Sequence, residues 1–295
     1  MCFNIKILTL AILMVFFGKD GFSEEKTILF LAGKSSHKQG VHEHLAGCQF
    51  LADCIAKSGL GISTVVLDFY QWDAMSSLDP KPDAILIYSD GYQKHPAIHH
   101  QDALQSLVDI GVGIACFHFA VEVEPDKLGT TFLSWLGGYF EIGWSVNPFW
   151  KAEFEVFPDH PVCNGVEPFG FHDEWYYHMR FVDNMEGVTP ILSTLPPEKT
   201  LKFRPRQPLR SNNPTVSKAV KNGQKQAVAW AYQRPDGGRG FGLTGGHLHK
   251  NWQDDNFRKV VLNALVWIAR LTVPEDGVPS KTPTNQELES YILKN

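Results

Sequence analysis

The sequence predicts a doubly wound α/β domain built on a parallel β-sheet. Its strands are short, uniformly apolar runs without alternation, which is typical of strands buried on both faces of a parallel sheet. These runs alternate with segments of helical periodicity, as right-handed strand–helix–strand crossovers require. The 295 residues are 43% hydrophobic, which is enough for one sizeable core.

The predicted elements follow one another in the expected order. Four apolar strands are predicted at residues 27–33, 62–67, 83–88 and 113–117. Helical spacing of apolar residues predicts helices at 41–57, 101–109 and 257–271. Residues 151–157 alternate like an amphipathic strand, and two more strands are predicted at 227–232 and 239–244.

Three segments fall outside the alternating pattern. Residues 139–180 form an aromatic-rich insertion, and residues 196–215 contain several prolines that predict a long surface loop. The chain beyond Pro274 is polar, so we expect residues 274–295 to be a tail or the start of a linker. The main domain is therefore expected to span residues 24–273.

The N-terminus predicts export to the periplasm or the extracellular space. Lys6 precedes an apolar run from Ile7 to Phe17, and the small residues Gly21 and Ser23 fit a cleavage site, so residues 1–23 are interpreted as a signal peptide. The apolar run is shorter than the roughly 20 residues that cross a bilayer. An uncleaved anchor is the alternative. After cleavage we expect no membrane association.

The net charge and the cysteine spacing argue against several classes of partner and of structural motif. A net charge of -5 gives no electrostatic reason to expect nucleic acid or an anionic membrane. The cysteines outside the predicted signal peptide have no spacing typical of a disulfide framework or a zinc motif, so we expect them to be buried.

Histidines gather where a parallel sheet binds ligands. In open parallel sheets the ligand site lies beyond the C-terminal ends of the strands. Nine of the twelve histidines follow predicted strands: His37, His42, His44, His95, His99, His100, His118, His247 and His249. Such sorting favours a functional site at that edge.

His118 leaves the fourth strand at a position similar to a nucleophile elbow. The G-x-S-x-G pattern is absent, and Cys116 lies two residues earlier, inside the predicted strand. A cysteine hydrolase would need its thiolate at the turn. We therefore interpret His118 as a catalytic or ligand-binding residue, with a purely structural histidine as the alternative.

Residues 172–178 combine acids, aromatics and histidines. Asp173 or Glu174 is a candidate general base or metal ligand. Trp175, Tyr176 and Tyr177 are candidates for a floor on which a sugar stacks. The alternative is a solvated loop whose aromatics only cover the sheet.

Two pairs of histidines have the spacing of metal ligands. His247 and His249 alternate on an extended segment after Gly245-Gly246 and can share a zinc or similar ion. His42 and His44 have the same spacing at the start of a helix, where positions two apart diverge. Only one of that pair is expected to point inward, and we favour His44.

Several short motifs resemble the trehalose-utilization ThuA-like family. They are His42-Glu-His-Leu-Ala-Gly47, the turn at Phe117-His118, Asp159-His-Pro161, Asp173-Glu-Trp-Tyr176 and Gly245-Gly-His247 before a Trp-containing helix. The resemblance extends from about residue 27 to residue 271. It implies a flavodoxin-like, class I glutamine amidotransferase-like fold and a link to carbohydrate metabolism. His44, His118, Asp173, Glu174 and His247 match the recurrent polar residues of the family. Glutaminase activity is not expected, because neither the elbow cysteine nor a His-x-Glu dyad is present.

The leading hypothesis is an exported enzyme that isomerises, cleaves by elimination or hydrolyses a sugar or keto-sugar derivative. In this hypothesis, His118, Glu174 and Asp173 are catalytic; Trp175, Tyr176, Tyr177 and His249 bind substrate; and His44, His118 and His247 hold a divalent metal such as zinc. A non-catalytic carbohydrate-binding domain and an inactive scaffold are the rival hypotheses.

Overall fold

The computed structural model describes residues 26–211 and 213–292. The predicted signal peptide, residues 1–23, lies outside the described residues. Across the described ranges no helix is both long and apolar enough to cross a bilayer.

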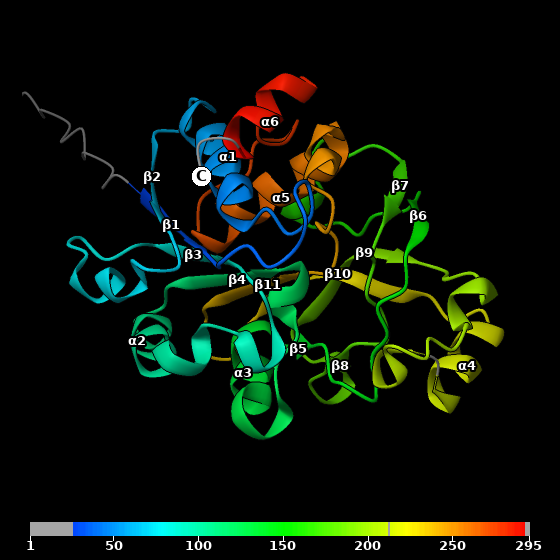
Figure 1. Cartoon of the computed structure of the whole chain (residues 1–295). Helices are drawn as coiled ribbons and strands as arrows, with labels where there is room; N and C mark the ends of the chain where they lie inside the picture. The colour runs from blue at the N-terminus through cyan, green and yellow to red at the C-terminus, as the bar shows by residue number, and fades with distance from the viewer. Residues whose placement is uncertain (1–25, 212, 293–295) are drawn as a thin grey trace, which may run out of the picture.

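A seven-stranded, mostly parallel sheet forms the centre of the molecule (Figure 1). Its strand order is β2-β1-β3-β4-β11-β10-β9. The strands are β1 (Lys26–Ala32), β2 (Ile62–Leu67), β3 (Ala84–Tyr88), β4 (Gly113–Phe117), β9 (Val188–Thr194), β10 (Gln226–Gln233) and β11 (Arg239–Leu243). The first five in this order are parallel, whereas β10 is antiparallel to both of its neighbours. The predicted doubly wound α/β class is confirmed, with the 2-1-3-4-5 order of flavodoxin-like sheets.

Helices cover both faces of the sheet (Figure 1). One face carries α1 (His44–Ala56), α5 (Asp255–Ile268) and α6 (Asn285–Ile292); the other carries α2 (Ala97–Asp109) and α3 (Thr130–Leu136). Successive strand residues point to opposite faces, so Phe30 packs into the first layer and Leu31 into the second. This explains why β3 and β4 are apolar throughout: both of their faces are buried, whereas the edge strand β2 is half-buried.

The aromatic-rich insertion forms two small antiparallel sheets beside the main one. One pairs β5 (Gly138–Tyr139) with β8 (Arg180–Phe181), and the other pairs β6 (Trp150–Phe154) with β7 (Phe169–Asp173). In the predicted loop at 196–215, the described residues before α4 (Pro214–Lys221) form only short 3-10 turns, and Asn213 caps the first turn of α4.

The C-terminal segment differs from the predicted polar tail, because residues 285–292 form α6 against α1. Leu288 is buried, and the ring of Tyr291 contacts Phe50 while its hydroxyl donates to Asp53. Two apolar side chains three residues apart are too short a pattern to identify such a helix in sequence. The contact with α1 provides the hydrophobic surface that the short helix needs.

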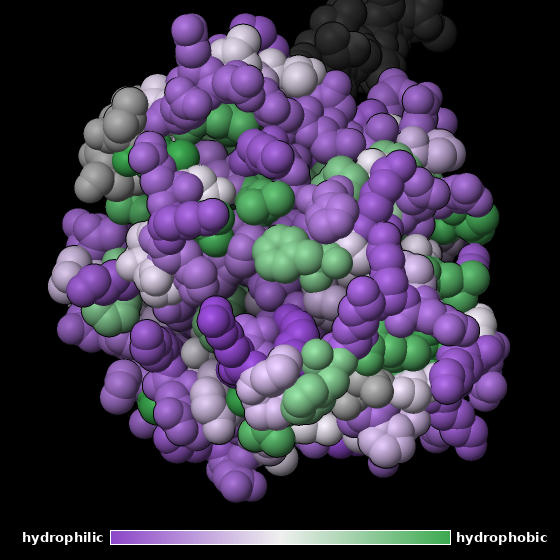
Figure 2. All heavy atoms as spheres, turned by 45° about the vertical axis from the view of Figure 1, so that its right-hand side comes forward, coloured by the Kyte–Doolittle hydropathy of each residue, from purple (hydrophilic) through white to green (hydrophobic). Residues whose placement is uncertain are grey.

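The molecular surface agrees with the ordinary charged composition of the chain. The face drawn in Figure 2 is mostly hydrophilic, and its hydrophobic side chains form small separate patches. Such scattered apolar exposure is normal for a globular protein.

Candidate metal centre

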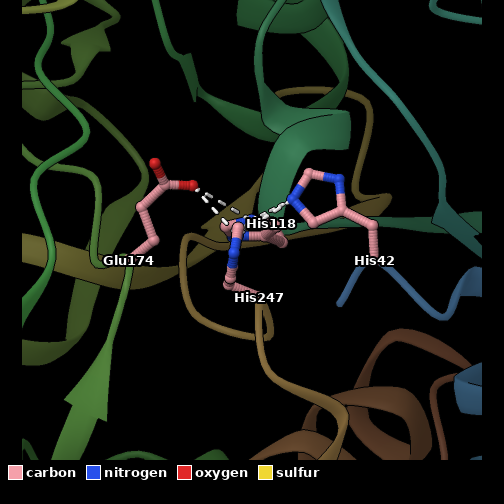
Figure 3. A group of neighbouring side chains, drawn as sticks. All are labelled: His42, His118, Glu174 and His247. Atoms are coloured by element: carbon pink, nitrogen blue, oxygen red, sulfur yellow. Dashed lines mark hydrogen bonds and ion pairs between the residues drawn. The ribbon is translucent and has the colours of Figure 1, made fainter. Parts of the chain in front are cut away.

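Four side chains from distant parts of the chain meet at the C-terminal edge of the sheet (Figure 3). His118 follows β4 directly, His247 lies in the loop after β11, and Glu174 follows β7. His42 precedes α1, in the loop that leaves β1. All four are largely or fully buried, with at most 8% of any residue exposed.

The three histidines present ring nitrogens to one another. His118 Nε2 lies 3.0 Å from His42 Nε2 and 3.1 Å from His247 Nδ1, and the latter two atoms are 3.0 Å apart. Glu174 Oε2 lies 3.1 Å from His247 Nδ1 and 3.6 Å from His118 Nε2. The nitrogens form a nearly equilateral triangle beside a carboxylate oxygen.

The hydrogen bond made by His118 Nδ1 determines whether His118 Nε2 carries a proton. His118 Nδ1 lies 2.8 Å from the carbonyl oxygen of Thr244, and only a protonated Nδ1 can donate to that oxygen. Burial, followed by the nearby His42 and His247, lowers the pKa of His118 well below its usual value. The ring is therefore neutral, and its Nε2 directs a lone pair into the triangle.

Two of these histidines are held in a backbone conformation that non-glycine residues rarely adopt. His42 and His118 both have φ of 52°, in the left-handed region. Such residues cost of order 1–3 kcal/mol each and cluster at functional sites. A hydrogen bond from His42 N to His247 O, 3.1 Å long, joins two of the loops that carry the rings. The fold thus stabilises a local conformation that brings the rings together.

This donor set fits a divalent metal. His42, His118 and His247 would hold such an ion, with the carboxylate of Glu174 beside them. Three imidazoles and one carboxylate are the ligands that zinc and similar ions prefer. A cation would also match His118, whose Nε2 carries no proton and can only accept.

Glu174 and Tyr176 complete the polar surroundings. Glu174 Oε1 accepts a 3.1 Å hydrogen bond from Asn147 Nδ2, which orients the carboxylate. The hydroxyl of Tyr176 lies 3.2 Å from His118 Nε2 and 3.4 Å from Glu174 Oε2. Burial, with Glu174 next, raises the pKa of Tyr176 well above its usual value, so this hydroxyl keeps its proton.

Asp173 supports the centre without facing it. Its Oδ1 accepts from the backbone N–H of Glu174 at 2.7 Å and of His247 at 3.2 Å. Its Oδ2 accepts from Gly246 N and from Asn251 Nδ2, both at 3.0 Å. These contacts fix the backbone of Glu174 and the segment that carries His247, so Asp173 holds residues of the centre in place without facing it.

Comparison with known proteins assigns the family. The family model described as "ThuA: Trehalose utilisation" matches residues 33–268. The chain belongs to the ThuA family. A putative ThuA-like protein from Bacteroides uniformis is 16% identical with a TM-score of 0.56, covering 83% of this chain and 91% of its own. One from Parabacteroides merdae is 13% identical with a TM-score of 0.55, covering 88% and 98%. No curated protein matches the chain.

In this ThuA-family chain, the histidine that joins His118, Glu174 and His247 is His42 and not His44, which the sequence had favoured. The sequence argument placed both residues on the helix, but α1 begins at His44, and His42 lies before it in the left-handed conformation. That conformation turns the His42 ring to His118 and His247. His44 is fully buried beside Tyr88 and Asp90 instead.

Three of the predicted substrate-binding residues have no surface available for a substrate. Trp175 and Tyr177 are 0% exposed and pack in the core layer of α1 and α5. His249 is buried in a 3-10 turn, residues His249–Gln253, against which α6 packs. The fourth, Tyr176, is also buried but reaches the centre through its hydroxyl.

The site also contains residues that the sequence did not single out. Asn147 orients Glu174, and Asp90, which follows β3, lies 3.4 Å from His42 Nδ1. Asp90 stands in the tripeptide Ser89-Asp-Gly91, where a polar residue at the end of a buried strand was the available signal.

Proposed function

We propose that this ThuA-family protein is a divalent-metal-dependent enzyme that acts on a sugar or keto-sugar derivative. The observation that carries the proposal is the convergence of three buried imidazole nitrogens, 3.0–3.1 Å apart, beside the carboxylate of Glu174. The family description, trehalose utilisation, supports a carbohydrate as the substrate class.

His42, His118 and His247 would hold the metal, which when bound polarises a carbonyl or hydroxyl oxygen of the substrate. Glu174 is the candidate general base, because its Oε2 faces the same point and its Oε1 is fixed by Asn147. It would take a proton from the carbon next to a sugar carbonyl, and the C–H electron pair would move towards the carbonyl oxygen. This step begins both isomerisation and elimination.

Tyr176 is the candidate proton donor in the same reaction. Its protonated hydroxyl lies within 3.4 Å of Glu174 and 3.2 Å of His118. Negative charge developing on a substrate oxygen would be stabilised by such a buried donor. We therefore propose that Tyr176 acts through its hydroxyl as a proton donor and not through stacking of its ring on a sugar.

A glutaminase or other cysteine-dependent reaction is not proposed. Cys116 is fully buried within β4 on the α2 and α3 side of the sheet, and burial raises the pKa of its thiol. A nucleophilic thiolate needs the opposite conditions: exposure at the site and a lowered pKa.

A non-catalytic carbohydrate-binding domain is less well supported by the geometry. Trp150, Trp175 and Tyr177 have at most 1% of their surface exposed and cannot form a stacking platform. The aromatic that does reach the surface beside the centre is Phe149, which is 46% exposed and edge-on to His247 at 4.7 Å. A single exposed ring beside the proposed metal ligands is consistent with a residue that contacts the substrate of an enzyme. A separate sugar-binding face would need several exposed rings.

We propose that the protein is exported, because residues 1–23 have the composition of a signal peptide. Sequencing the N-terminus of the protein recovered from the cells that make it tests this. A start near Glu24 supports cleavage, whereas a start at Met1 contradicts it.

The enzyme proposal is tested on purified protein by elemental analysis and by a turnover screen of disaccharides and their oxidised derivatives. The His118→Ala variant should lose one equivalent of zinc and all turnover, whereas His99→Gln, at an exposed position on α2, should change neither. Unchanged zinc in His118→Ala contradicts the ligand assignment. Sugar binding that persists without metal and without turnover supports the binding-domain alternative.

A further inference from the structure

A second set of metal-ligand side chains surrounds Asp90, next to the proposed centre. Asp90 Oδ1 lies 3.4 Å from His42 Nδ1, 3.9 Å from His44 Nε2 and 2.8 Å from Ser36 Oγ. His37 belongs to the same group, since its ring nitrogen lies within 4.8 Å of the ligand atoms of His42 and Asp90. The His42 ring therefore lies between two clusters: its Nε2 faces His118 and His247, and its Nδ1 faces Asp90.

His44 has a buried nitrogen whose bonding is incomplete. Its Nδ1 lies 3.2 Å from the carbonyl oxygen of Lys34, so that nitrogen must carry the proton and donate. Its Nε2 is then an acceptor, is fully buried, and has no hydrogen-bond partner within residues 26–211 and 213–292. An unsatisfied buried polar atom costs about 1–3 kcal/mol, so such an atom usually has a ligand.

The atom that Nε2 of His44 faces is also an acceptor. Asp90 Oδ1 lies 3.9 Å away, too far for a hydrogen bond, and neither atom has a proton to share. An ion at ordinary zinc distances, about 2.0–2.1 Å from nitrogen and about 2.0–2.2 Å from oxygen, spans such a gap with a bent N–metal–O angle. A cation between the two atoms would satisfy both.

We propose that a second divalent cation of the zinc class binds here, held by Asp90 and His44, with His37 supporting Asp90 through Ser36. His37 is exposed, and its Nδ1 lies 2.8 Å from Ser36 Oγ, which also donates to Asp90, so His37 helps to orient the carboxylate. Imidazole and carboxylate donors favour zinc over calcium or magnesium.

The second cation would fix the loop that carries His42. Residues 34–44 contribute His37, His42 and His44, and they connect β1 to α1 through a strained residue, His42. Because the ring of His42 separates the two clusters, the second ion would not contact a substrate bound at the first. Its role is structural: it would hold His42 in the orientation that the first centre needs.

Zinc stoichiometry tests this inference on the full-length protein. Apo-protein is titrated with Zn²⁺, and bound zinc is measured by elemental analysis after desalting. We expect two equivalents for the wild type and for the His99→Gln control, and one each for His44→Ala and His118→Ala. Since removing the buried His44 can perturb folding, the exposed His37→Ala variant serves as a second test. It should weaken the second equivalent by about tenfold and leave the first unchanged.

The outcomes separate this inference from the proposed function on which it partly rests. One equivalent in the wild type, lost in His118→Ala and kept in His44→Ala, overturns the second site and leaves the first. Two equivalents in both the wild type and His44→Ala also overturn it. No bound zinc in the wild type overturns both proposals.

Discussion

The Asp173→Asn variant distinguishes a positioning residue from a catalytic one. Each carboxylate oxygen of Asp173 accepts two hydrogen bonds, from donors that belong to Glu174, Gly246, His247 and Asn251. Whichever way the asparagine amide is turned, its NH₂ group faces two N–H donors. In the less costly orientation, the hydrogen bonds from Gly246 N and Asn251 Nδ2 are lost; Gly246 N is left buried and unsatisfied, whereas Asn251 Nδ2 still donates to the carbonyl oxygen of His172.

The expected loss follows from those contacts. One unsatisfied buried donor costs about 1–3 kcal/mol and the other lost hydrogen bond about 1 kcal/mol, so the free energy of unfolding falls by about 3 kcal/mol. For a protein of this size that corresponds to a fall in Tm of roughly 10 °C. Urea unfolding followed by tryptophan fluorescence gives the free energy, and calorimetry gives the Tm.

Glu174→Gln is the matched control, because Glu174 contacts the centre through one oxygen and Asn147 through the other. Glutamine can still accept from Asn147, so stability should change by less than about 1 kcal/mol while turnover is lost. If Asp173→Asn keeps its stability and loses turnover, Asp173 is catalytic and the positioning role is refuted.

Three further predictions concern other buried groups. Burial lowers the pKa of His95 to about 4. The stability that this neutral ring contributes is therefore present above pH 6.5 and is lost as the pH falls towards 4. We expect the free energy of unfolding to fall by about 2 kcal/mol at pH 5, and His95→Gln should abolish this fall. Tyr176→Phe should lower turnover by about 10–100-fold with unchanged zinc content, because it removes the hydroxyl near His118. Cys116→Ala should leave turnover unchanged, since the thiol is buried inside β4.

Each of these predictions has a contradicting result. An equal pH dependence of unfolding in His95→Gln and wild type would assign the acid sensitivity to other groups. Loss of zinc in Tyr176→Phe would show that the hydroxyl helps to hold the metal rather than to transfer a proton. A large fall in turnover in Cys116→Ala would contradict this prediction and support a cysteine-dependent hydrolase.

Much of the fold could be predicted because short apolar runs, above all those buried on both faces such as β4, leave a strong signal in the sequence. The strands at 62–67 and 113–117 were predicted at their observed bounds, and the family that the motifs resemble is confirmed. The helix at residues 285–292 was not predicted, since it depends on a contact with α1 that spans more than 200 residues of sequence.

The sequence located the edge of the sheet at which the candidate centre lies, but not its full ligand set. His118 directly follows β4 and His247 lies in the loop after β11, so strand prediction places both at one edge. The choice between His42 and His44 depends on a single φ angle of 52°, which no spacing rule reveals. The burial of Trp175 depends likewise on tertiary packing, because an aromatic side chain suits both a core and a sugar-binding surface.

Anomalous diffraction at the zinc edge, on crystals of the full-length protein grown with Zn²⁺, tests the central claim most directly. The proposal predicts a peak within bonding distance of His42 Nε2, His118 Nε2 and His247 Nδ1, on the side of Glu174. A map with no peak among these three nitrogens, at a zinc concentration that saturates the protein in solution, would contradict it.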